Sequence, residues 1–116
     1  MKVAITSQNF RTITGHAGKT RRFLVYAVSE DGQWQEQERL DLPKEMSLHE
    51  YHGDDHPAYT FDTIITASCG ENFVRRMQAH GVEVLATSES DPQTALQSVI
   101  LGQPLPPPAA HKEEQA

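Results

Sequence analysis

Short apolar runs separated by polar residues and glycines predict strands at residues 2–7, 20–29, 33–42, 61–67 and 82–87. The run at 20–29 is apolar on both alternations, which is typical of a strand covered on both faces. The run at 33–42 is rich in charged residues, which favours a position at the edge of a sheet. Asp31 and Gly32 lie between these two runs and predict a hairpin turn.

Helical spacing of apolar residues predicts a helix over 71–80, ended by Gly81. A last helix is expected to begin at Ser90 or Asp91, with Pro92 in its first turn, and to stop at Gly102. A further helix is predicted to start at Ser47, because Ser47 and Glu50 have capping-box spacing. Gly53 and Pro57 would keep that helix short or broken.

The resulting order, β-β-β-α-β-α-β-α, predicts an α/β fold. Two short connections allow antiparallel pairing, and two helical crossovers require parallel strands. The simplest sheet has five strands in the order 3-2-1-4-5 with helices on both faces, which is the ribonuclease H-like arrangement. Residues 1–102 would form this one domain. Residues 103–116 begin with four prolines among six positions and predict an extended, disordered tail.

The composition argues against a nucleic-acid-binding, membrane-spanning or secreted protein. The 116 residues carry a net charge of −6, which does not suit a protein whose main task is to hold nucleic acid. No apolar run is long enough for a membrane span, and the start turns polar too early for a signal peptide. A single cysteine, Cys69, makes the reducing cytoplasm the expected compartment.

Charge is unevenly distributed along the chain. Residues 1–29 contain five basic and no acidic side chains, whereas residues 30–62 contain ten acidic and two basic ones. A local cationic loop on an acidic molecule indicates a compact anionic ligand, unless these charges are simply solvated faces.

The predicted topology indicates where a site would lie. Ligands of open α/β sheets bind at the carboxyl ends of strands, where the strand order changes direction. The segments 8–19, 43–50 and 68–71 should converge there, bringing Gly15, His16 and Gly18 close to Cys69 and Gly70. The amino end of the following helix would lower the pKa of the Cys69 thiol, although a lone cysteine is often only a small buried apolar residue.

A second candidate site is a histidine-rich stretch. His49, His52 and His56 would share one face of an unbroken helix and could bind a single zinc, iron, nickel or copper ion. The spacing matches no recognised zinc signature, and an exposed polar loop is the alternative interpretation. The carboxylates that nuclease chemistry needs at the sheet centre are missing, and nothing in the sequence forms a convincing catalytic site, so we predict that the chain is not an enzyme. A thiol enzyme with Cys69 as nucleophile is the competing catalytic hypothesis.

Several segments resemble the dinitrogenase iron–molybdenum cofactor biosynthesis family, which includes NifX- and NafY-type carriers and the carboxyl-terminal part of NifB. Residues 1–7 resemble its first strand, and Gly15-His16-Ala17-Gly18 followed by Arg22-Phe23-Leu24-Val25-Tyr26 resembles its His-Phe-Gly loop and next strand. Residues 61–70 resemble the strand that enters a glycine-rich turn, and residues 81–102 resemble the closing strand and helix.

The resemblance implies a non-catalytic carrier of an iron–sulfur or iron–molybdenum cofactor, or of its precursor, in nitrogen fixation. It implies that His16 is a cluster ligand. The residues themselves indicate that Cys69 assists as a thiolate ligand and that Lys19, Arg21 and Arg22 offset the negative charge of the cluster. Partners would be the proteins that donate and accept the cofactor, and the carrier would be a monomer or weak dimer. Ala17 replaces the family's phenylalanine, and Cys69 is not generally found at its place in the family.

Overall fold

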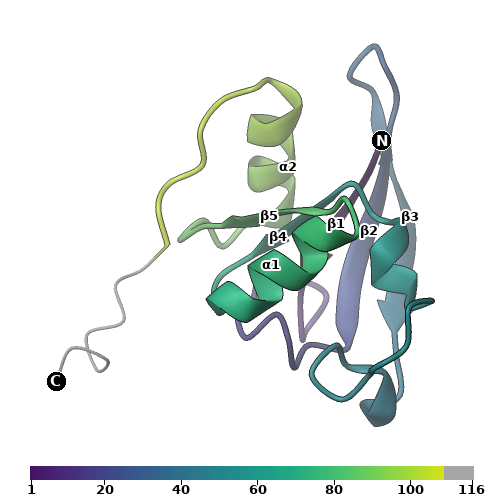
Figure 1. Ribbon diagram of the computed structural model, residues 1–116. Helices are drawn as coiled ribbons and strands as arrows, with labels where there is room; N and C mark the ends of the chain where they lie inside the picture. Colours follow the sequence, from purple (N-terminus) through teal and green to yellow (C-terminus); the bar gives the residue numbers. More distant parts are fainter. Residues whose placement is uncertain (109–116) are drawn as a thin grey trace, which may run out of the picture.

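The computed structural model describes residues 1–108, in which five strands form one mixed sheet (Figure 1). The strands are β1 (Lys2–Thr6), β2 (Arg22–Val28), β3 (Trp34–Asp41), β4 (Thr63–Thr66) and β5 (Glu83–Ala86). Their order is β3-β2-β1-β4-β5. Strand β2 is antiparallel to both β1 and β3, whereas β4 is parallel to β1 and β5. The predicted strand order and directions are therefore confirmed.

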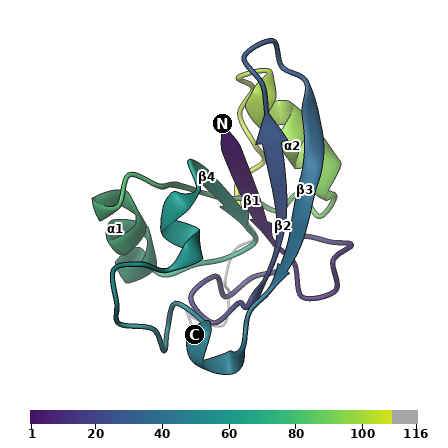
Figure 2. The same ribbon diagram turned by 90° about the vertical axis from the view of Figure 1, so that its right-hand side faces the viewer.

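The two α-helices, α1 (Glu71–Ala79) and α2 (Pro92–Ile100), pack on opposite faces of the sheet (Figure 2). Ala4 of β1 belongs to the buried cluster that includes Phe73 and Met77 of α1. Its neighbours in β1, Val3 and Ile5, belong to the cluster that includes Ala95 and Leu96 of α2. Because successive side chains of a strand point to opposite faces, this alternation confirms that helices cover both sides.

The predicted limits of both helices are close to the observed ones. The Asp91 carboxylate caps α2 by accepting hydrogen bonds from the backbone N–H of Thr94 at 2.8 Å and from its hydroxyl at 2.6 Å. Gly81 follows α1 with a φ of 79°, a left-handed conformation that glycine adopts without steric cost. Helix α1 begins after Gly70, which makes no side-chain cap hydrogen bond.

The prediction of a helix that begins at Ser47 is wrong. The Ser47 hydroxyl does accept a hydrogen bond from the Glu50 N–H at 3.3 Å, so the local capping contact forms. Only one helical turn follows it, between two short 3₁₀ helices, η1 (Lys44–Met46) and η2 (Pro57–Thr60). Pro57 starts the second of these, and the chain between them is irregular.

Arg76 of α1 holds this irregular segment against the helix. Its Nε donates a hydrogen bond to the hydroxyl of Tyr59 at 2.8 Å, and its Nη2 donates one to the carbonyl of Tyr51 at 2.5 Å. Its Nη1 donates to the carbonyl of Leu48, whose side chain is buried in the core. One guanidinium group thus provides the hydrogen bonds that fix residues 48–59 in the absence of a helix.

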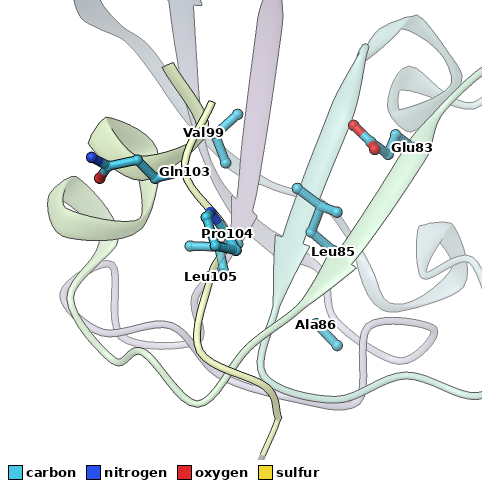
Figure 3. Close-up of a pocket in the computed structure, with 7 residues that line it drawn as sticks. All are labelled: Glu83, Leu85, Ala86, Val99, Gln103, Pro104 and Leu105. Atoms are coloured by element: carbon cyan, nitrogen blue, oxygen red, sulfur yellow. The ribbon is translucent and has the colours of Figure 1, made fainter. Parts of the chain in front are cut away.

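The proline-rich segment after α2 lies along the end of the sheet. The Thr87 hydroxyl donates a hydrogen bond to the carbonyl of Pro106 at 2.7 Å, and Leu105 packs against the α2 side of the core. A cavity of about 300 Å³ remains between this segment, α2 and β5, lined mainly by apolar side chains such as Leu85 and Val99 (Figure 3). Residues 103–108 of the predicted tail are therefore extended and in contact with the domain, whereas 109–116 lie outside the described residues.

Within residues 1–108, no helix combines the length and the apolar character needed to cross a membrane.

Candidate functional site at the carboxyl ends of the central strands

Two buried threonines end the central parallel strands. Thr6 ends β1 and Thr66 ends β4, and their hydroxyl oxygens lie 2.8 Å apart. The Thr6 hydroxyl donates a hydrogen bond to the carbonyl of Thr14 at 2.6 Å, and the Ala67 N–H donates to the same carbonyl at 3.1 Å. The loop after β1 is therefore fastened to the end of β4 and the loop after it by hydrogen bonds that include two fully buried threonine hydroxyls.

The same pair of loops makes two further contacts at Ser68. The backbone N–H of His16 donates a hydrogen bond to the Ser68 hydroxyl at 2.9 Å, and the N–H of Ala17 donates to the Ser68 carbonyl at 3.1 Å. These bonds join residues that are about fifty positions apart in the sequence. They fix the Gly15–Gly18 turn beside the residue that precedes Cys69.

His16 is held in an uncommon backbone conformation, with a φ of 55°. Its carbonyl accepts hydrogen bonds from the N–H groups of Lys19 at 2.8 Å and Thr20 at 3.1 Å. Both backbone polar groups of His16 are therefore used by the fold. The imidazole is exposed and, among the described residues, makes no hydrogen bond or ion pair, which leaves the ring free for a ligand.

Gly15 permits the close approach of the two loops. A Cβ atom at this position would lie 2.3 Å from Ser68 Oγ and 3.3 Å from Ser68 Cβ. Gly18 is different, because a Cβ there would meet only Phe73 Cδ1, at 3.8 Å. A side chain at position 15 would therefore displace the Ser68 hydroxyl that binds the His16 N–H, whereas one at position 18 would make only an ordinary contact.

Cys69 is half-buried and packs against the α1 side of the core. Burial raises the pKa of the Cys69 thiol, so the expectation that the helix terminus would lower this pKa is wrong. Gly70 beside it is exposed and has no atom within 4 Å of a Cβ placed on it, so the space next to the cysteine is open.

The third segment predicted to converge here also reaches the turn. The backbone N–H of His49 donates a hydrogen bond to the carbonyl of Gly18 at 2.6 Å. A cavity of about 180 Å³ lies at this junction, lined by residues of the turn, of segment 48–49 and of α1: Gly18, Leu48, His49, Asn72, Phe73 and Arg76. The three segments therefore meet at one edge of the sheet, as the topology predicted.

Arg22 is directed to other partners. Its Nε lies 3.4 Å from the Asp41 carboxylate, and its Nη1 donates a hydrogen bond to the carbonyl of Gln8 at 2.8 Å. Its guanidinium also lies 5.8 Å from the centre of the Phe10 ring, which packs on the α2 side of the core. These interactions hold the Arg22 side chain toward Asp41, Gln8 and Phe10.

The three histidines predicted to share a helical face do not form a metal site. His49 and His52 are exposed, whereas His56 is buried. Both His56 ring nitrogens have backbone partners: Nε2 lies 2.5 Å from the Met46 carbonyl, and Nδ1 accepts a hydrogen bond from the Ala58 N–H. No group of three metal-ligating side chains occurs within residues 1–108. The prediction fails because the helix that would have aligned the histidines does not form.

We predict that Gly15→Ala lowers the free energy of unfolding by about 1–3 kcal/mol, because the added methyl group overpacks the contact with Ser68. Gly18→Ala is the matched control and should leave stability unchanged or raise it slightly, since its Cβ makes only an ordinary contact. Urea denaturation of both variants tests this difference. Equal stabilities for the two variants would show that the loops are not packed as described.

The second prediction concerns pH. Burial lowers the pKa of His56 from its ordinary value of 6.5, against the opposing effect of the Met46 carbonyl. The unfolded chain therefore takes up this proton before the folded one, and stability should fall as the pH drops below about 6.5. His56→Gln should flatten the pH dependence between about pH 7 and pH 5, whereas His52→Gln, at an exposed position, should retain it. An unchanged slope in His56→Gln, measured by urea denaturation at each pH, would contradict the assignment.

Comparison with known proteins agrees with this architecture. Among curated proteins, none matches the sequence. The crystal structure of PH0822 is similar, with a TM-score of 0.69 and 17% identity over 89% of this chain and 93% of that one. The crystal structure of mj0327 from Methanocaldococcus jannaschii, provisionally described as a dinitrogenase, is similar with a TM-score of 0.66 and 15% identity. The match covers 89% of this chain and 90% of that one. The NMR structure of TM1290 from Thermotoga, provisionally described as a NifB protein of the DUF35 family, is similar with a TM-score of 0.57 and 18% identity. The match covers 88% of this chain and 89% of that one.

At these identities the likeness to solved structures establishes the fold alone. The family is established by the sequence itself, because the model of the family "Dinitrogenase iron-molybdenum cofactor" matches residues 1–102, the whole of the predicted domain. The chain therefore belongs to the dinitrogenase iron–molybdenum cofactor family.

Proposed function

We propose that this protein binds and carries an iron–sulfur or iron–molybdenum cofactor, or a precursor of it, with His16 as the principal cluster ligand. Membership of the family supports a role in the biosynthesis of the iron–molybdenum cofactor. The observation that carries the proposal is the fixed backbone and exposed side chain of His16. Its backbone is fixed at a φ of 55° by Ser68, Lys19 and Thr20, while its imidazole is exposed and unpaired among the described residues.

Such a histidine suits transfer of a cluster. Neutral imidazole is a good ligand for iron, and the fixed backbone of His16 means that only its side chain has to be ordered on binding. Exposure lets a second protein reach the same cluster. A single accessible ligand on a fixed backbone therefore favours reversible binding, which a carrier requires.

Cys69 is proposed to be a second, conditional ligand. Its thiol is protonated at neutral pH because burial raises its pKa, so it offers no preformed thiolate. Coordination to a metal deprotonates a thiol, and the released proton makes binding dependent on pH. The same raised pKa disfavours the competing hypothesis of a thiol enzyme, which needs a thiolate nucleophile near neutral pH.

The surroundings of the turn agree with an anionic cargo. Lys19 begins a short cationic stretch at the end of the turn, and Gly70 leaves open space beside Cys69. Ala17, which replaces the family's phenylalanine, is fully buried and belongs to the core. We infer that its small side chain lets the turn lie directly on Ser68.

We also infer that the domain is a non-catalytic member of the ribonuclease H-like class.

Carriage implies at least two partners, one that donates the cofactor and one that accepts it. Both would approach the edge of the sheet where the His16 turn lies, because the imidazole is exposed there. The alternative of a mononuclear site at His49, His52 and His56 has no support from the positions of these side chains.

The test is anaerobic reconstitution with iron and sulfide, followed by metal and sulfide analysis and by charge-transfer absorption. His16→Asn is the informative variant, because asparagine tolerates the left-handed conformation and removes only the imidazole. Its affinity for the reconstituted cluster should be about tenfold lower than that of the unmodified protein, which is the usual scale for loss of a metal-site interaction.

His52→Asn is the matched control and should bind like the unmodified protein, since His52 is exposed and lies in the irregular segment before η2. Cys69→Ser should reduce cluster retention and remove the proton release on loading. Full retention by His16→Asn would overturn the proposal. A colourless protein that holds one zinc ion, lost on replacement of His49 and His52, would do the same.

A further inference from the structure

A second pocket lies next to the candidate site, on the other side of His49. Its volume is about 520 Å³, within the usual range for sites that bind small molecules. It is lined by residues from the end of the first loop and from the segment after β3: Lys19, Arg21, Lys44, Ser47, His49 and Glu50.

Backbone hydrogen bonds fix the two walls of this pocket relative to each other. At one end the N–H of Leu42 donates to the carbonyl of Arg21 at 2.9 Å. At the other end the N–H of His49 donates to the carbonyl of Gly18 at 2.6 Å. The cationic side chains are therefore brought together by the fold rather than by chance proximity of two free loops.

The pocket collects positive charge on an acidic molecule. Lys19, Arg21 and Lys44 contribute three cations, and the single carboxylate, that of Glu50, lies 3.9 Å from the His49 ring. Within residues 1–108, the ion pairs made by lysine and arginine involve Arg22, Arg39 and Arg75 but none of these three cations. On a protein with 16 acidic residues, these three cations therefore have no ion-pair partner in the described part of the chain and are available to a bound anion.

We propose that this pocket binds a small molecule bearing two or more oxyanion groups, either phosphates or carboxylates. The Arg21 guanidinium offers the planar fork that recognises either group, although its Nη1 also donates to the Leu42 carbonyl at 3.4 Å. Lys19 and Lys44 supply point charges from the two walls. The proposal does not rest on cluster binding by His16, because none of its charged groups is a cluster ligand.

The experiment is isothermal titration calorimetry of the cluster-free protein with pyrophosphate and, separately, with citrate at low ionic strength. At least one of these anions should bind saturably, with a Kd of about 1 mM or lower. Pyrophosphate alone would identify a phosphorylated ligand, citrate alone would identify a polycarboxylate, and binding of both would establish the shared oxyanion chemistry.

Lys44→Gln is the main variant, because Lys44 is exposed and its removal leaves the Arg21–Leu42 and Gly18–His49 backbone bonds intact. It should weaken binding about tenfold, and Lys44→Glu should weaken it further. Arg75→Gln changes the net charge by the same amount at an exposed position of α1 outside the pocket, and should change Kd less than about twofold.

The proposal is overturned if neither anion binds saturably up to about 10 mM, or if Arg75→Gln weakens binding as much as Lys44→Gln. The second result would mean that the anions respond only to the overall charge of the protein. His16→Asn should leave anion binding unchanged, so failure of this proposal can be distinguished from failure of the proposed cluster site.

Discussion

The hydrogen-bonded junction between the loops that follow β1 and β4 is the constraint on which the candidate site depends. The parallel pairing of these strands brings Thr6 and Thr66 together at their carboxyl ends, where the Thr14 carbonyl accepts bonds from both loops. The Thr6 and Thr66 hydroxyls are fully buried, so leaving either one without a hydrogen bond would cost free energy. The junction therefore determines the course of the Gly15–Gly18 turn and, through Ser68, the position of the His16 backbone.

The irregular segment after β3 completes the site from the other side. Where a helix would have satisfied its own backbone groups, this segment relies on Arg76 of α1 and on the buried ring of His56. It brings His49 to the carbonyl of Gly18 and Lys44 to the neighbouring pocket. Because this segment is not helical, its three histidines do not share one face. Its residues instead line the walls of two cavities.

Sequence patterns predicted the sheet well, because strand order follows from the lengths of the connections and the helix limits follow from local residues such as Asp91 and Gly81. They failed at Ser47, where the local capping contact is present but Pro57 and the burial of His56 prevent a helix. Burial also reversed the expected effect on Cys69, which local sequence could not reveal.

The residues that sequence reasoning missed are Thr6, Thr66 and Ser68. Most of their contacts join positions 51 to 60 residues apart, a separation that no helical or strand periodicity reports. The available signal was the pair of hydroxyl residues that ends two apolar runs, Ile5-Thr6-Ser7 and Ile65-Thr66-Ala67-Ser68. In neighbouring parallel strands such residues necessarily meet at one edge of the sheet.

The most direct test of the central claim is to record the NMR signals of the histidine rings while the protein is loaded anaerobically with iron and sulfide. A paramagnetic cluster broadens nearby signals most strongly, so the account predicts that the His16 ring signals disappear first while those of His52 and His80 persist. Loss of the His49 and His52 signals with unchanged His16 signals would contradict it.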